Sequence, residues 1–207
     1  MTKIETTPAT GIADLLPRAA AKYGSKPAVT FNDGGWKTRS YAEVGDDVRA
    51  LAKGLMALGV EKGDKVSILG NTRPEWTYYD FAALSAGATV VPIYQTNSPE
   101  ECQYVLHDSD AKVVVVEDEA QLEKVRAVRD TLPALEHVIL MVGTAGDAIS
   151  SDDLTKRGES IADSDWAARY GSVGGDDICT FIYTSGTTGP PKGAMKPLPN
   201  LMETELD

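Results

Sequence analysis

Residues 65–94, KVSILGNTRPEWTYYDFAALSAGATVVPIY, decide the fold. Lys65–Leu69 and Thr89–Tyr94 are short apolar runs that predict strands. Pro74–Gly87, between them, predicts a helix, because proline suits the first turn of a helix. A strand, a helix and a second strand in this order are typical of two parallel strands joined by a crossover.

The same alternation continues on both sides of this unit. A serine followed three residues later by glutamate forms a capping box, and this pattern predicts helix starts at Ser40 and Ser98. Glu119–Leu132 predicts a further helix and Val138–Val142 a further strand. Val113–Val116 is apolar at every position, so both faces of that strand should be covered. We therefore predict an α/β fold, a mostly parallel sheet with helices on both faces.

Three further segments are assigned from composition. Pro27–Phe31 and Trp36–Tyr41 flank the turn signal Asn32-Asp33-Gly34-Gly35 and predict a short N-terminal β-hairpin. Residues 1–10 are expected to form a flexible arm. Residues 143–177, rich in Gly, Asp, Ser and Glu, predict a long polar connection with one or two short helices.

Charge and composition narrow the function. Lys+Arg 20 against Asp+Glu 31 gives a net charge of −11, which argues against a nucleic-acid binder. Two distant cysteines and two histidines are a poor metal inventory and fit a reducing compartment. The N-terminus lacks a secretory apolar run, and no stretch is long and apolar enough to span a bilayer. We therefore predict a cytoplasmic protein without a transmembrane segment.

The chemistry is concentrated after the predicted strand Ile178–Tyr183. The segment Thr184–Gly193 reads TSGTTGPPKG and combines four hydroxyl side chains, three glycines and one lysine. Glycines allow a ligand to approach the backbone, exposed amides bind anions, and Lys192 adds a positive charge. One lysine cannot balance the roughly four negative charges of a nucleoside triphosphate, so a divalent cation must contribute. A flexible surface loop is the alternative, but a loop directly after a sheet strand is where α/β proteins bind ligands.

The spacing excludes two common phosphate-binding motifs. A P-loop needs glycine immediately before its lysine, whereas Pro191 precedes Lys192 here and Gly193 follows it. A dinucleotide fingerprint needs G-x-G-x-x-G, and that pattern does not occur.

The loop instead resembles the phosphate-binding signature of the adenylate-forming, or AMP-binding, superfamily. That signature, [ST]-S-G-[ST]-T-G-x-P-K-G, is matched at every specified position of Thr184–Gly193. Ser40-Tyr41-Ala42-Glu43 and Ser85–Tyr94 are similar to two upstream family segments. Gln95–Val105 is similar to long-chain acyl-CoA synthetases, including the bubblegum type.

This resemblance implies the first part of the large N-terminal domain of an adenylate-forming enzyme, over residues 11–195. The family reaction joins a fatty acid to AMP with release of pyrophosphate, and CoA then displaces AMP. ATP and Mg²⁺ would be required, CoA would be a co-substrate, and the full-length enzyme could contact a membrane peripherally. The β- and γ-phosphates would be held by the matching loop residues: Thr184, Ser185, Gly186, Thr187, Thr188, Gly189 and Lys192.

Two departures from the family pattern keep alternatives open. The family's adenine, ribose, metal-motif and C-terminal lysine elements would lie beyond Asp207, so this fragment is expected to lack turnover alone. Residues 196–207 are atypical, with Leu198 where the family commonly has histidine, and predict a disordered tail. No catalytic residue is therefore assigned. An acyl-AMP or aryl-CoA ligase, or a non-catalytic nucleotide-binding remnant, remain the alternatives to a long-chain acyl-CoA ligase.

Overall fold

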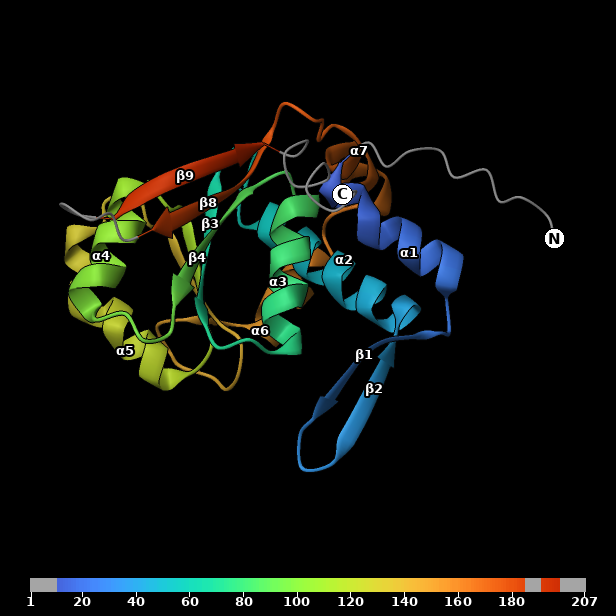
Figure 1. Cartoon of the computed structure of the whole chain (residues 1–207), viewed down its shortest axis with the longest axis horizontal. Helices are drawn as coiled ribbons and strands as arrows, with labels where there is room; N and C mark the ends of the chain where they lie inside the picture. Colours follow the sequence, from blue (N-terminus) through green and yellow to red (C-terminus); the bar gives the residue numbers. More distant parts are fainter. Residues whose placement is uncertain (1–10, 185–190, 198–207) are drawn as a thin grey trace.

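A computed structural model describes residues 11–184 and 191–197. Within this part of the chain, seven strands form one sheet in the order β7-β6-β5-β3-β4-β8-β9 (Figure 1). Neighbouring strands run parallel except β9, which is antiparallel to β8. The strands are β3 (Lys65–Gly70), β4 (Thr89–Tyr94), β5 (Val113–Val116), β6 (His137–Leu140), β7 (Ile149–Ser150), β8 (Ile178–Thr184) and β9 (Lys192–Pro197).

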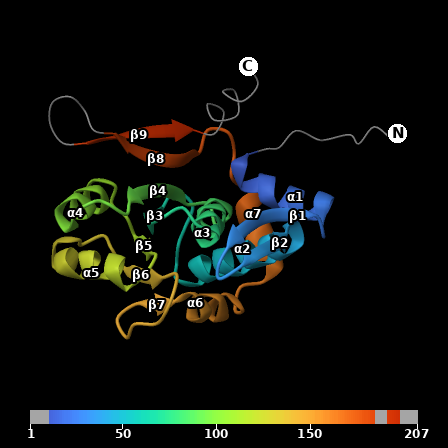
Figure 2. The same ribbon diagram turned by 60° about the horizontal axis from the view of Figure 1, so that its bottom comes forward.

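Helices cover both faces of this sheet, as the sequence predicts. Figure 2 shows α4 and α5 on one side of the central strands and α2, α3 and α6 on the other. The helices are α1 (Leu15–Tyr23), α2 (Tyr41–Ala57), α3 (Pro74–Ser85), α4 (Pro99–Asp108), α5 (Glu119–Val128), α6 (Ser151–Gly158) and α7 (Asp163–Gly171). No helix within the described residues is long and apolar enough to cross a membrane.

Strand β5 shows why both faces must be covered. Val113 and Val115 pack into the core beneath α2, α3 and α6, while Val114 and Val116 pack into the core beneath α4 and α5. All four valines are fully buried. Burying a valine side chain contributes about 1.5–3 kcal/mol, so this short strand stabilises both layers.

Local sequence signals set the ends of the helices. The Ser40 and Glu43 capping box is formed: the Ser40 amide donates to the Glu43 carboxylate at 2.8 Å and the Glu43 amide to the Ser40 hydroxyl at 3.3 Å. The same reciprocal pair joins Ser98 and Glu101 at the start of α4. After α2, Gly59 adopts a φ of +82°, a conformation that favours glycine.

The predicted N-terminal hairpin is confirmed. β1 (Pro27–Asn32) pairs antiparallel with β2 (Trp36–Ser40) and forms a separate two-stranded sheet. Gly34 has a φ of +64°, which explains the glycine at this tight turn. Figure 1 shows the hairpin projecting from the body of the molecule below α2.

The polar stretch 143–177 contains more packed structure than a surface connection. It carries β7, α6 and α7, and the side chain of Leu154 in α6 is fully buried against α2. The first two residues of the predicted tail 196–207, Lys196 and Pro197, belong to β9. The expected arm, residues 1–10, lies outside the described residues, as do residues 198–207.

Two glycines allow α2 and α6 to pack with their backbones in contact. A Cβ added at Gly54 would lie 2.5 Å from the Leu154 carbonyl oxygen, and one added at Gly158 would lie 2.7 Å from the Gly54 nitrogen. Contacts this short with backbone atoms cannot be relieved by rotating a side chain. Gly171, at the end of α7, has open space around the same position.

We expect Gly54→Ala to lower the free energy of unfolding by about 1–2 kcal/mol. Overpacking costs about 1–3 kcal/mol, and the better helix propensity of alanine recovers up to about 1 kcal/mol. Urea unfolding followed by circular dichroism measures the change, with Gly171→Ala as a helical control expected to differ little from the unmodified chain. Equal midpoints for Gly54→Ala and the control would contradict this packing.

One carboxylate on α3 is partly buried. Asp80 is on α3, and its charge acts on the buried thiol of Cys179 in β8. Burial raises the pKa of Asp80 to about 6, well above its ordinary value of 3.8. The folded protein therefore binds this proton more tightly than the unfolded chain does.

We expect Asp80 to reduce the stability of the fold as the pH rises from about 4 to 6. Above pH 6 the carboxylate is charged in the folded protein, and the free-energy cost of burying that charge then lowers the stability in full. Two pKa units correspond to about 3 kcal/mol, which is an upper bound on this cost. Asp80→Asn should therefore stabilise the protein by about 1–3 kcal/mol more at pH 7 than at pH 4. Urea unfolding at both pH values tests this, and a pH-independent difference between the two proteins would refute it.

Candidate functional site

The predicted phosphate-binding loop connects β8 to β9. Thr184 is the last residue of β8, Lys192 is the first residue of β9, and the two are directly paired across the strands. Both are exposed. The other predicted site residues, Ser185, Gly186, Thr187, Thr188 and Gly189, lie outside the described residues, so their role stays a prediction.

The two described members of the predicted site are thus brought together by strand pairing. The antiparallel register continues from Thr184 with Lys192 to Ile178 with Pro197. Within the described residues, no carboxylate forms an ion pair with Lys192, whereas the ammonium groups of Lys53 and Lys112 are each paired with an aspartate. In the part of the chain that the structure describes, the positive charge of Lys192 is therefore not neutralised by a carboxylate.

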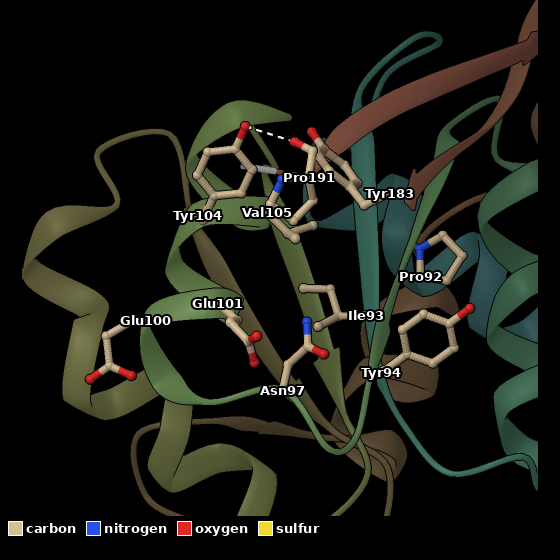
Figure 3. Close-up of a pocket in the computed structure, with 10 residues that line it drawn as sticks. All are labelled: Pro92, Ile93, Tyr94, Asn97, Glu100, Glu101, Tyr104, Val105, Tyr183 and Pro191. Carbon is tan, nitrogen blue, oxygen red and sulfur yellow. Dashed lines mark hydrogen bonds between the residues drawn. The ribbon is translucent and has the colours of Figure 1, made fainter. Parts of the chain in front are cut away.

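A cavity of about 400 Å³ lies beside the base of the loop (Figure 3). Because β8 runs parallel to β4, both strands end at the same edge of the sheet, and α4 borders the cavity opposite them. The lining is mixed, with aromatic, proline and carboxylate side chains: Pro92, Ile93, Tyr94, Asn97, Glu100, Glu101, Tyr104, Val105, Tyr183 and Pro191.

Two tyrosines attach the hairpin formed by β8 and β9 to α4. The Tyr104 hydroxyl donates to the Pro191 carbonyl at 2.8 Å, a bond drawn in Figure 3. The Tyr183 hydroxyl donates to the Asp108 carboxylate at 2.7 Å. Burial and this bond both raise the pKa of the Tyr183 phenol, so it stays protonated and keeps donating well above neutral pH. The two rings meet edge to face, with centroids 6.3 Å apart.

The ring of Tyr183 also explains why residue 193 of the motif is a glycine. Gly193 is the strand partner of Tyr183, and a Cβ at Gly193 would lie 3.1 Å from the Cζ atom of the Tyr183 ring. The ring therefore occupies space that a side chain at this position would need. Gly193 thus has a packing role in β9 in addition to the flexibility that the sequence suggests.

A second polar cluster lies at the ends of β3 and β5. The buried Glu117 carboxylate accepts from the Asn71 backbone amide at 2.6 Å, from its side-chain amide at 2.8 Å, and from Arg73 at 3.2 Å. Burial acts to raise the pKa of Glu117, but these hydrogen bonds outweigh it and the pKa lies below its ordinary value. Arg73 also pairs with Glu75 at 2.7 Å. The charge of Arg73 is therefore already neutralised. This cluster connects the loop after β3 to the loop after β5 and does not offer a site for an anion.

The described residues offer no metal centre of their own. Residues 11–184 and 191–197 contain no group of three or more His, Cys, Asp or Glu side chains that could hold a metal ion. The Mg²⁺ expected from the sequence stays a prediction.

Sequence reasoning missed the contacts made by α4. Tyr104 and Asp108 are four residues apart on one face of this helix, a spacing that the sequence shows. Their partners, Pro191 and Tyr183, lie more than 70 positions away in the chain. No local pattern could have paired them.

Comparisons with known proteins agree with this architecture. The family model described as AMP-binding enzyme matches residues 16–206. The long-chain-fatty-acid–CoA ligase FadD15 of Mycobacterium tuberculosis is 41% identical over 170 residues, which cover 82% of this chain and 28% of that protein. The long-chain-fatty-acid–CoA ligase ACSBG1 of Rattus norvegicus is 35% identical over 198 residues, covering 93% of this chain and 28% of that protein.

Solved structures give the same result. The anthranilate CoA ligase AuaEII in complex with anthranoyl-AMP superposes with a TM-score of 0.80 at 27% identity, covering 92% of this chain and 35% of that one. The inhibitor-bound N-terminal domain of FACL13 from Mycobacterium tuberculosis superposes with a TM-score of 0.74 at 28% identity, covering 91% of this chain and 44% of that one.

The fold and the comparisons together define an α/β domain of the type found at the N-terminus of adenylate-forming enzymes. The chain belongs to the AMP-binding enzyme family. It spans about 28% of the length of the curated relatives it matches. The resemblance seen in the sequence is therefore confirmed at the level of the family.

Proposed function

We propose that this chain supplies the ATP phosphate-binding loop of a long-chain fatty acid–CoA ligase. In the proposed reaction a fatty acid carboxylate attacks the α-phosphorus of ATP, pyrophosphate leaves, and the CoA thiol then displaces AMP from the acyl-adenylate. The loop would hold the β- and γ-phosphates and stabilise the negative charge that develops on the departing pyrophosphate. ATP, with Mg²⁺ bound to its phosphates, would be the substrate form.

One observation carries this proposal: Thr184 and Lys192 are paired at the base of a loop whose sequence matches the family signature at every specified position. A hydroxyl at the carboxyl edge of a parallel sheet, beside an ammonium group that has no carboxylate partner among the described residues, suits a polyanion. The long-chain ligases among the relatives support the fatty acid as the acyl substrate. A cytoplasmic location and peripheral contact with a membrane stay predictions.

The chain taken alone has a narrower proposed role. Because it covers about 28% of its relatives, we propose that it binds the phosphates of Mg-ATP without completing the ligase reaction. Acyl-CoA formation by the 207-residue chain would contradict this narrower role.

A second candidate within the family is an aryl-CoA or acyl-AMP ligase. The superposition on an anthranilate CoA ligase favours it, since that fold accommodates an aromatic acid. In a full-length protein carrying this chain, a panel of long-chain and aromatic acids, assayed with and without CoA, distinguishes the candidates. Formation of acyl-CoA from long-chain acids supports the first proposal, and formation of acyl-CoA from aromatic acids alone supports an aryl-CoA ligase. An acyl-adenylate that accumulates in the presence of CoA supports an acyl-AMP ligase.

We expect Lys192→Ala to weaken binding of Mg-ATP to this chain by about tenfold or more. A hydrogen bond involving a charged group contributes about 1.5–3 kcal/mol, and 1.4 kcal/mol corresponds to a factor of ten. Isothermal titration calorimetry measures the dissociation constant. Magnesium tripolyphosphate should lose affinity to the same extent, because the lysine is proposed to contact phosphate only.

Lys196→Ala is the matched control for this experiment. Lys196 is exposed, lies four residues further along β9 and carries the same charge. Its removal should change the dissociation constant less than twofold. An unchanged affinity of Lys192→Ala, or equal losses in both variants, would overturn the assignment of the loop.

A further inference from the structure

We propose that Tyr104 is a positioning residue for the phosphate-binding loop, acting through the peptide group that joins Pro191 to Lys192. This inference rests on the proposed function of the loop. It adds a residue from α4 that lies outside the loop motif, and it assigns α4 the role of holding both ends of the loop.

The Pro191 carbonyl is held in place from α4. It accepts a hydrogen bond from the Tyr104 hydroxyl at 2.8 Å. A carbonyl and the N–H of the next residue belong to one planar peptide group, so fixing the Pro191 carbonyl also fixes the plane of the Lys192 amide. The proline ring also fixes the φ angle of Pro191 itself near −65°. The orientation of the backbone at Lys192 is therefore restricted, and with it the position from which the Lys192 side chain extends.

The other end of the loop is held by the same helix. Asp108, one helical turn after Tyr104, accepts a hydrogen bond from the Tyr183 hydroxyl at 2.7 Å. Tyr183 immediately precedes Thr184, and its ring packs beside Gly193. Tyr104 thus contacts Pro191, which immediately precedes β9, and Asp108 contacts Tyr183 in β8. Each contacted residue is next to a predicted phosphate-binding residue.

Helix α4 is suited to this role because its own position is well fixed. Its start is held by the capping box of Ser98 and Glu101, and Val105 and Leu106 are buried in the core shared with α5. A rigid helix that holds Tyr183 and Pro191 in place lowers the conformational entropy that Thr184 and Lys192 lose when they bind a ligand. The expected consequence is tighter phosphate binding, rather than a more stable fold.

The test compares Tyr104→Phe with Tyr94→Phe. Each substitution removes one hydroxyl from a tyrosine that lines the same cavity, and Tyr94 is 68% exposed. Calorimetric titration with magnesium tripolyphosphate should show affinity about three- to tenfold weaker for Tyr104→Phe, the size of one neutral hydrogen bond. Tyr94→Phe should change affinity less than twofold. Both variants should keep the urea midpoint of the unmodified chain to within a small difference.

A double-mutant cycle separates positioning from a general effect on the structure. If Tyr104 acts through the Lys192 peptide group, Tyr104→Phe should weaken tripolyphosphate binding less than twofold in a Lys192→Ala background. Independent, additive losses in the two backgrounds would overturn the inference. So would an unchanged affinity of Tyr104→Phe in the otherwise unmodified chain.

Failure of this inference can be distinguished from failure of the proposed function. If Lys192→Ala weakens binding and Tyr104→Phe does not, the loop assignment stands and only the role of Tyr104 is wrong. If the unmodified chain does not bind magnesium tripolyphosphate or Mg-ATP, the proposed function is wrong for this chain and the inference falls with it.

Discussion

Burial of both faces of the central strands is the constraint on which the rest of the structure depends. Strands β3, β4 and β5 alternate their side chains between two apolar cores, so helices must cover each face. Crossover helices make the strands parallel, and parallel strands all end at one edge of the sheet. Polar residues that follow these strands are therefore gathered at that edge. The Glu117 cluster and the hairpin loop both lie where strands end, although they are far apart in sequence.

The β8–β9 hairpin joins this sheet along β4, and side chains reinforce the junction. β8 and β4 share a single register pair, Val90 with Thr180. Two threonine hydroxyls complete the junction: Thr89 donates to the Ile178 carbonyl at 2.8 Å, and Thr180 donates to the Val90 carbonyl at 3.0 Å. Outside this junction, the hairpin is held at its loop end by α4. The hairpin is therefore attached at two separate points, to β4 and to α4.

Much of this architecture could be predicted from the sequence, because it depends on local signals. The capping boxes at Ser40 and Ser98 and the four valines of β5 each have a short-range pattern with one physical reading. β9 has no such pattern: all its residues except Pro197 are exposed, and its pairing is decided by β8. The packing of α6 could not be predicted either, since it depends on Gly54 and Gly158 facing each other across two helices. For the site, the motif identified Thr184 and Lys192, whereas the contacts of Tyr104 and Asp108 required the fold.

The charge balance shows why neutral donors suit this loop. The chain carries a net charge of −11, and three carboxylates of α4, at Glu100, Glu101 and Asp108, are close to the hairpin or its cavity. A basic residue on α4 holding the hairpin would pair with these carboxylates. A carboxylate contacting Lys192 would instead neutralise the one cation of the motif. Tyrosine hydroxyls avoid both outcomes, because they anchor backbone and carboxylate oxygens without bringing a further charge. Among the described residues, the ammonium group of Lys192 therefore has no carboxylate partner. In a protein of net charge −11, such a local positive charge favours the proposed binding of an anion.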